Sequence, residues 1–289
     1  MTAGASGLVV VDKPAGLTSH DVVSRVRRLA GTRKVGHAGT LDPLATGVLV
    51  LGVNRATRLL GHLMLTEKAY DATVRLGVAT TTDDAEGEVL STTSTAGVDE
   101  EAVRAALAGF VGDIQQVPTA VSAIKVDGKR AYQRVREGED VQLEARPVTV
   151  HELVVHDVCR TGEHLDVRIS VRCSSGTYIR AIARDLGTRL GVGGHLTALR
   201  RTAVGPYDLA AAHTLEELGD DFRLMPIAEA ARRAFPAREL DEPQAADVRV
   251  GRALDLDVDG LTAVFDPHGE FLALYEPRGG AAKPVAVFV

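Results

Sequence analysis

The sequence predicts an α+β fold around a largely antiparallel sheet, because strand-like and helix-like segments are mixed along the chain without regular alternation. Apolar and polar residues alternate from Leu165 to Cys173, which is typical of a half-buried strand. Shortly afterwards, Ile179, Ile182 and Leu186 recur at helical spacing. Near the C-terminus, short apolar runs separated by proline and glycine indicate a second, β-rich unit.

The first fifty residues predict a strand, a helix and another strand. Leu8–Val11 is a short apolar run that a Lys-Pro turn ends. Thr18 or Ser19 can cap a helix that Gly31 stops. The apolar run Val48–Leu51 then predicts a buried strand.

The next elements are a strand, a loop and a helix. Alternation over Tyr70–Leu76 predicts a half-buried strand. The polar stretch Thr80–Glu86 is expected to be a loop. Asp99 is positioned to cap a helix whose apolar face extends to Phe110.

Residues 122–147 carry many charges and little apolar periodicity, so they form either a mobile excursion or a short helix over 131–136 flanked by loops. Further on, Ser174-Ser175-Gly176 should turn the chain after the clearest strand. Thr177 is then expected to cap the following helix, and Gly191 to end it.

A composition shift near Phe235-Pro236 divides the chain into an expected larger domain, 1–234, and a small acidic C-terminal domain, 235–289. The strands expected in the small domain are Leu261–Phe265, Phe271–Tyr275 and Val285–Val289.

The composition indicates a cytoplasmic protein. The 289 residues are 45% hydrophobic, and no apolar run is long enough to cross a membrane. Met1–Gly7 lacks the pattern of a secretory signal. The two cysteines, Cys159 and Cys173, are too few for a disulfide framework. No segment demands an oligomer, so we expect a monomer without an obligatory protein partner.

No motif for a metal or a cofactor occurs in the sequence. The nine histidines form no H-x-x-x-H pattern and do not pair with the cysteines. The glycines of 36–47 are not followed by the Gly-Lys-Ser/Thr ending of a phosphate loop, and no G-x-S-x-G elbow is found. We therefore expect neither a metal nor a cofactor.

A net charge of −6 would argue against a nucleic-acid partner if the charges were evenly spread along the chain. They are not evenly spread. Acids concentrate in the last third of the chain. This segregation predicts a basic working face, although each cluster alone would be an ordinary solvated surface. The three basic groups are Lys13, Arg25, Arg27, Arg28, Arg33 and Lys34; Lys125, Lys129, Arg130, Arg134 and Arg136; and Arg200 with Arg201.

The segment 36–49, GHAGTLDPLATGVL, surrounds the single carboxylate Asp42 with three glycines, one proline and one histidine. Such a segment is a shaped loop, and Asp42 is either a turn residue or a nucleophile presented at the mouth of a strand. A carboxylate nucleophile must stay ionised, so it needs a cation nearby. Arg180 is a candidate because it starts a helix just after a turn, with Arg184 on the same outer face.

Five segments, in order, resemble the TruB family of tRNA pseudouridine-55 synthases. The resemblance extends from about Gly7 to about Glu217. Besides 36–49, the similar segments are LVVVDKPAG (8–16), EKAY (67–70), CSSGTYIR (173–180) and HLTALRR (195–201). The resemblance implies a pseudouridine-synthase fold, with helices flanking a mixed central sheet, and isomerisation of uridine to pseudouridine in the TΨC arm of tRNA. The reaction needs no cofactor.

The resemblance also implies roles for individual residues. Asp42 is the expected nucleophile, and Arg180 pairs with its carboxylate and keeps it charged. Tyr70 is expected to stack on the target base and to handle a proton. The acid attacks either C1′ of the sugar or C6 of the base, and the sequence does not distinguish these.

Four further residues are expected to contact or shape the substrate site. Leu199 packs against the uracil, and Tyr178 belongs to the same binding site. His37 fills the place that the target nucleotide leaves when it is flipped out of the RNA stack. Lys13 is expected to shape the site rather than to react, or it is a surface lysine before a turn.

Residues 122–147 resemble a thumb-like insertion of the family, whose Lys125, Lys129 and Arg130 would meet phosphates. By position and size, 235–289 resembles a PUA-type RNA-binding module, although its acidity departs from a simple RNA-binding surface. The family often has an acid where Thr81 stands, and Asp84 is expected to take a nearby structural role.

Two other functions compete with this one. A tRNA-binding or tRNA-folding module, in which catalysis is incidental, would need the basic clusters but not the combination of Asp42, Tyr70 and Arg180. An unrelated hydrolase with an aspartate nucleophile would need a general base, and the sequence links no second acid to Asp42.

Overall fold

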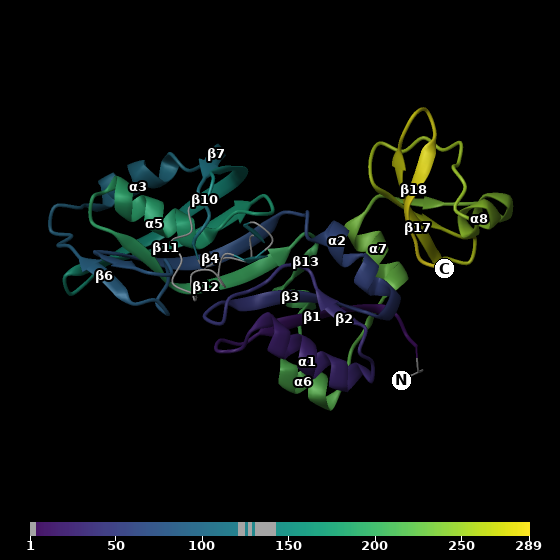
Figure 1. Cartoon of the computed structure of the whole chain (residues 1–289), viewed down its shortest axis with the longest axis horizontal. Coiled ribbons are helices and arrows are strands. Elements are labelled where there is room, and N and C mark those ends of the chain that lie inside the picture. The colour runs from purple at the N-terminus through teal and green to yellow at the C-terminus, as the bar shows by residue number, and fades with distance from the viewer. Residues whose placement is uncertain (1–3, 121–124, 127–128, 131–142) are drawn as a thin grey trace.

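The computed structural model describes residues 4–120 and 143–289, and the backbone of 125–126 and 129–130. Its centre is a mixed, largely antiparallel sheet, which confirms the α+β class (Figure 1). Along the main path of this sheet, only β3 and β12 pair in parallel. The path runs β14 (Met225–Pro226), β1 (Gly7–Lys13), β3 (Thr46–Val53), β12 (Gly194–Val204), β4 (Lys68–Leu76), β11 (His164–Cys173), β10 (Arg146–Thr161) and β7 (Gly112–Gln116), while β2 (Val35–His37) pairs with β3 and β13 (Tyr207–Asp208) with β12.

Helices cover the two halves of the sheet separately. α3 (Glu100–Ala108) and α5 (Ile179–Arg189) pack on β4, β10, β11 and β12 in one apolar cluster. α1 (Ser19–Ala30) and α6 (Leu215–Asp220) share another cluster with β1, β2 and β3 (Figure 1). The four strands expected within 8–76 and 165–173 are confirmed as β1, β3, β4 and β11.

The ends of α1 follow the sequence prediction. The Thr18 hydroxyl accepts a hydrogen bond from the Asp21 N–H at 3.1 Å, and the Asp21 carboxylate accepts one from the Thr18 N–H at 2.9 Å. This reciprocal pair satisfies N–H groups that have no partner within the helix. Gly31 ends the helix in the left-handed conformation, with φ of 63°. Asp99 likewise caps α3, by accepting from the Ala102 N–H at 2.8 Å.

The expected start of α5 is wrong by one residue. Tyr178 is the N-cap, and its side chain makes no capping hydrogen bond. The Thr177 hydroxyl instead donates to the Ser174 carbonyl at 3.0 Å, within the preceding turn. The side-chain amide of Gln116 holds the backbone of Tyr178, since its oxygen accepts from the Tyr178 N–H at 2.8 Å and its nitrogen donates to the Tyr178 carbonyl at 3.1 Å. A side chain from a distant strand has replaced a local cap.

Two polar segments differ from their expected form. Thr80–Glu86 was expected to be an ordinary polar loop, but it begins in β5 (Val78–Thr80) and buries Asp84, which is 3% exposed. β5 pairs with β6 (Val89–Thr92). Within 122–147, β8 (Lys125–Val126) pairs with β9 (Lys129–Arg130), and Arg146 already belongs to β10. The alternative helix over 131–136 lies outside the described residues.

The C-terminal part forms its own four-stranded sheet with one helix. Its strands, in spatial order, are β15 (Ala237–Glu239), β16 (Thr262–Phe265), β17 (Phe271–Pro277) and β18 (Ala282–Val287), and its helix is α8 (Glu242–Arg249). The short helices that precede it in sequence include α2 (Leu60–Leu63), the 3-10 turn Leu209–Ala211 and α7 (Ile227–Ala234). In the part of the chain that the structure describes, no helix is long and apolar enough to span a membrane.

A continuous apolar cluster joins this C-terminal sheet to the larger part. Leu60 and Leu63 of α2 share the cluster with Phe271 and Phe288. A side-chain hydrogen bond strengthens the joint, because the guanidinium of Arg55, in the 3-10 helix Asn54–Arg58, donates to the Phe288 carbonyl at 2.7 Å. In Figure 1, α2 and α7 lie between the two sheets.

Candidate active site

Asp42 lies in the loop that links β2 to β3, and this loop is held from several sides. The hydroxyl of Ser19, at the start of α1, accepts from the Leu41 N–H at 2.9 Å and donates to the Leu41 carbonyl at 3.0 Å. Gly47 closes the loop with φ of +97°, and a β-carbon there would lie 2.1 Å from the Arg201 carbonyl oxygen. Only glycine fits this close approach of two backbones.

Lys13 supports the loop through its buried ammonium group. Its side chain is fully buried, and its ammonium donates to the carbonyls of Leu17 at 2.7 Å, Pro14 at 2.9 Å and Pro43 at 3.3 Å. Burial lowers the pKa of Lys13 to about 8, although the nearby charge of Asp42 opposes this shift. Lys13 is thus no surface lysine, and it is absent from the residues that line the cavity described below.

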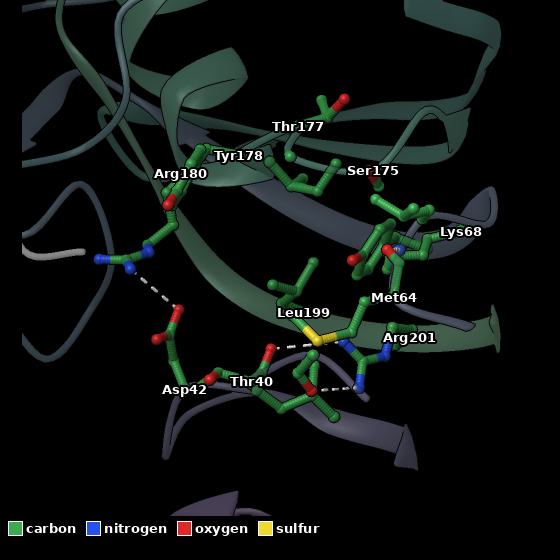
Figure 2. A pocket seen from close by; sticks show the side chains of 16 residues that line it. Thr40, Asp42, Met64, Lys68, Ser175, Thr177, Tyr178, Arg180, Leu199 and Arg201 are labelled. Carbon is green, nitrogen blue, oxygen red and sulfur yellow. Dashed lines mark hydrogen bonds and ion pairs between the residues drawn. The ribbon is translucent and has the colours of Figure 1, made fainter. Parts of the chain in front are cut away.

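Arg201 holds the loop from the opposite side. Arg201 is 1% exposed, and its guanidinium donates to the carbonyl of Val48 at 2.7 Å. It also donates to the carbonyls of Gly39 at 3.2 Å and Thr40 at 3.3 Å (Figure 2). A planar donor with several N–H groups is suited to fixing consecutive carbonyls in space. Two buried cations therefore hold the backbone around Asp42: Arg201 binds the carbonyls of Gly39 and Thr40 before it, and Lys13 binds the carbonyl of Pro43 after it.

The predicted pairing of Asp42 with Arg180 is present. A guanidinium nitrogen of Arg180 lies 3.0 Å from a carboxylate oxygen of Asp42. The Arg180 side chain is 7% exposed, whereas that of Asp42 is 38% exposed and open to the cavity. The sequence suggested that Arg180 lies on the outer face of its helix. Instead, α5 is oriented so that Arg180 points inward and is buried.

A second carboxylate shares the same arginine. Arg180 Nη1 lies 3.4 Å from Asp84 Oδ2 and donates to the Thr82 carbonyl at 2.9 Å. Asp84 is itself fixed, because it accepts from the Glu86 N–H at 3.0 Å. The segment that contains Asp84 therefore positions the guanidinium of Arg180. The structural role expected for Asp84 is thus to hold Arg180 in place.

These groups open onto a cavity of about 420 Å³. Asp42 and Arg180 form one end, and Tyr70, Leu199 and Lys68 line the rest (Figure 2). The other lining residues are Gly39, Thr40, Leu41, Met64, Leu65, Ser175, Gly176, Thr177, Tyr178, Ile179 and Arg201. Burial raises the pKa of the Tyr70 phenol, although the Arg201 cation beside it opposes this shift. The cavity thus combines an exposed carboxylate, an apolar wall and a neutral phenol.

The cavity thus brings together five of the predicted residues: Asp42, Tyr70, Tyr178, Arg180 and Leu199. His37 ends β2 outside the cavity lining, and its ring meets that of His20 edge to face at 5.7 Å. The side chains of Lys125, Lys129 and Arg130 lie outside the described residues.

Sequence reasoning missed Lys68 and Arg201 as parts of the site. Their signal was the strand alternation itself. Lys68 precedes Tyr70 by two residues in β4, and Arg201 follows Leu199 by two in β12, so each pair shares one face of its strand. Extending the predicted strand 70–76 by two residues toward the N-terminus would have placed Lys68 beside Tyr70. Placing Arg201 beside Leu199 would have required a strand over 195–201, which was not predicted.

Family models match nearly the whole chain. The N-terminal domain model of the TruB family pseudouridylate synthases matches residues 27–179, which is more than half of the chain. The chain belongs to the TruB family. Two further models match the C-terminal side of this TruB enzyme: the tRNA pseudouridylate synthase B C-terminal domain at residues 180–233, and the tRNA pseudouridine synthase II C-terminal domain at 235–289.

Similar proteins agree with the TruB assignment. The tRNA pseudouridine synthase B of Arthrobacter sp. (strain FB24) is 59% identical over 98% of this chain and 96% of that protein. The protein of the same name from Thermobifida fusca (strain YX) is 58% identical over 98% and 99%. This TruB-family chain is therefore a pseudouridine synthase.

Solved structures confirm the fold. The crystal structure of a Cbf5-Nop10-Gar1 complex contains a chain that matches 98% of this TruB enzyme over 85% of its own length, with a TM-score of 0.75 and 27% identity. A chain of the archaeal box H/ACA sRNP Nop10-Cbf5 complex matches 99%, over 87% of its length, with a TM-score of 0.74 and 25% identity.

Proposed function

We propose that this enzyme converts uridine 55 in the TΨC arm of tRNA into pseudouridine, with Asp42 as the nucleophile. The observation that carries the proposal is the exposed Asp42 carboxylate, paired at 3.0 Å with the buried Arg180 in a cavity that Tyr70 and Leu199 line. The relatives named tRNA pseudouridine synthase B support tRNA as the substrate. The reaction takes place in the cytoplasm and needs no second protein.

The isomerisation moves one bond and one proton. The N1–C1′ bond breaks, the uracil turns, and C5 bonds to C1′. The proton on C5 leaves and N1 receives one, so no redox step and no external group is required. The carboxylate of Asp42 adds either to C1′ or to C6 and is released when the new bond has formed. Arg180 keeps that carboxylate ionised inside a partly dry site.

The target uridine must leave the RNA stack before it reaches Asp42. The flipped base would lie between Tyr70 and Leu199, with Tyr178 at the same site. Tyr70 is kept neutral by burial, so it can stack on the base and move a proton as a phenol. His37 would fill the gap in the RNA with a flat ring. Lys13 takes no part in the chemistry, because its three carbonyl contacts commit it to the loop.

Phosphates would meet the basic groups outside the cavity. Lys125, Lys129 and Arg130 of the insertion, and Arg25 and Arg28 on the exposed side of α1, are the proposed contacts. The C-terminal sheet would act as a PUA-like module that supports the complex, and its acidity makes it a minor contributor to phosphate binding.

The direct test is to incubate the protein with an unmodified tRNA transcript, without added metal or cofactor, and to map pseudouridine at each position. We expect modification at position 55, and none in a transcript with cytidine there. Pseudouridine at another position alone would contradict the proposed target. No pseudouridine in any tRNA would contradict the proposed function.

Asp42→Asn separates the enzyme from a tRNA-binding module. The amide is nearly isosteric with the carboxylate but is not an anionic nucleophile. We therefore expect this variant to bind the TΨC stem-loop with nearly unchanged affinity and to form no pseudouridine. Measured turnover by Asp42→Asn would mean that another group is the nucleophile, and a large loss of affinity would mean that Asp42 acts mainly in binding.

A further inference from the structure

Two exposed apolar side chains stand at the rim of the cavity, where the turn after α2 leads into β4. Met64 is 46% exposed and Leu65 is 75% exposed. In the described part of the chain, these are the exposed large hydrophobic side chains that line the cavity of Asp42. Figure 2 shows Met64 extending toward Leu199. Adjacent exposed apolar side chains at a functional opening indicate a binding surface.

The turn that presents this pair is fixed in place. The Lys68 ammonium donates to the carbonyl of Met64 at 2.9 Å and to that of Thr66 at 2.8 Å. The Thr66 hydroxyl donates to the Leu63 carbonyl at 2.7 Å. Leu63 itself is buried in the cluster that joins α2 to the C-terminal sheet. The apolar pair is thus held outward by the partly buried polar contacts of its turn, instead of folding into the core.

We propose that Met64 and Leu65 form an apolar platform for an unstacked RNA base next to the flipped target uridine. The proposal rests on the proposed function, because it takes the cavity as the site of that uridine. A neighbouring nucleotide that leaves the stack together with the target uridine also exposes the faces of its base. These faces need an apolar partner, because the His37 ring covers only the bases that stay stacked. The platform is continuous with the cavity lining, so a neighbouring base would reach it without leaving the site.

A base suits this surface better than a protein does. Stable protein interfaces bury about 800 Å² on each partner, with roughly 20 or more residues a side. Two neighbouring side chains offer far less than that, but they match the face of one base. Stacking contacts tolerate any base, because every base has an apolar face. The platform would therefore add affinity for RNA without reading its sequence.

The test is a double-mutant cycle between protein and RNA. Leu65→Ser and the double variant Met64→Ser/Leu65→Ser are measured for affinity to a TΨC stem-loop, intact or with an abasic residue on the 5′ or the 3′ side of the target. We expect Leu65→Ser to weaken binding of the intact RNA roughly five- to tenfold, toward the lower end of base-stacking contacts. Binding of one abasic RNA should be equally weak for wild type and variant, which assigns the base.

Two further variants separate this role from a structural one. Leu65→Phe should bind the intact RNA as tightly as wild type or more tightly, because an aromatic ring stacks better than leucine. Val250→Ser, at a 69% exposed position in the C-terminal part, serves as the matched control and should bind normally.

Three outcomes would overturn the platform. Leu65→Ser could bind like wild type, or it could lose equal affinity for intact RNA and both abasic RNAs. Alternatively, sedimentation could show that wild type self-associates through this face and that Leu65→Ser prevents it, which would make a second copy the occupant. If wild type forms no pseudouridine but the cycle still couples Leu65 to one base, the platform stands and the proposed function falls.

Discussion

Arg180 is the residue on which the charge balance of the site depends. It is buried and lies within 3.4 Å of both Asp42 and Asp84, while it also donates to the Thr82 carbonyl. A guanidinium can serve three oxygens at once because its donors fan out in one plane. Asp84 therefore does more than add charge, since it aligns the fork that reaches Asp42.

For Arg180→Lys we expect turnover to fall by at least about a hundredfold, the scale seen when a preorganised donor is removed. An ammonium keeps the charge but cannot hold Asp42, Asp84 and the Thr82 carbonyl in the same fixed plane. Single-turnover rates with saturating stem-loop RNA measure this loss. Near-normal turnover would remove the argument that the ion pair activates Asp42. Arg184→Lys, on the same helix and outside the cavity lining, is the control and should keep most activity.

Lys68 should leave a signature in the pH dependence of stability. Burial lowers its pKa from 10.5 to about 8. Between these values the unfolded chain binds the proton and the folded chain does not, so the free energy of unfolding gains a term that rises with pH. Below pH 8 Lys68 is protonated in both the folded and the unfolded chain. The folded protein is then destabilised by the full cost of burying the ammonium charge.

Urea unfolding of wild type and Lys68→Met at pH 7, 8, 9 and 10 tests this signature. The difference between the two proteins cancels other titrations, including that of Lys13. It should move in favour of wild type as the pH rises from 8 to 10. Lys34→Met, at an exposed position, should show no such trend. A constant difference for Lys68→Met would mean that Lys68 keeps its proton in the folded protein.

At the scale of elements, α1 links a local cap to the active loop. Thr18 caps the helix, and the adjacent Ser19 holds the backbone of Leu41 by two hydrogen bonds. Thr18→Ala removes the cap and should lower the free energy of unfolding by about 1 kcal/mol. Thermal unfolding measures the change, and Thr18→Ser should restore most of it. An unchanged midpoint for Thr18→Ala would mean that packing alone holds the start of α1.

Elements with strong local signals were predictable from the sequence. β11 alternates cleanly, and α1 has both a capping box and a terminal glycine. The start of α5 could not be predicted, because its cap comes from Gln116, a residue distant in sequence. The burial of Asp84 could not be predicted for the same reason. A buried carboxylate needs a cation as its partner, and that partner, Arg180, is distant in sequence.

The site followed the same rule. Asp42 and Arg180 could be paired in advance by their charges and by the resemblance to a known family. Lys68 donates hydrogen bonds to carbonyls of a nearby turn, and Arg201 donates to carbonyls of a loop distant in sequence. No residue pattern in the sequence predicts such hydrogen bonds to the backbone. Alternation along β4 and β12 predicts the face on which they lie but not the groups that they bind.

At the scale of the whole molecule, basic and acidic regions are separated although the net charge is −6. RNA affinity should therefore fall with rising salt, with a slope of roughly −0.7 to −0.9 for each phosphate contact in a plot of log affinity against log salt. Binding titrations between low and moderate salt measure this slope. A flat response would contradict the basic working face.

One residue of that face can be tested with a matched control. Arg28→Gln, on the exposed side of α1, should weaken binding and reduce the magnitude of the salt slope by about one contact. Arg223→Gln, at an exposed position beside Asp221 in the acidic region, should leave the slope unchanged. Equal effects of both substitutions would mean that net charge, rather than a local face, governs RNA binding.

The parallel contact of β3 with β12 joins two halves of the sheet that supply different site residues and are synthesised at different times. Asp42 comes from the N-terminal half of the sheet, whereas Tyr70, Arg180 and Leu199 come from the other half. The two halves meet where Gly47 packs against the backbone of Arg201. This contact is so close that the two strands cannot shift along each other. During synthesis, Asp42 therefore leaves the ribosome long before Arg180 of α5, and the two side chains can pair only after α5 has emerged. The Asp42–Arg180 pair thus forms late in the synthesis of the chain.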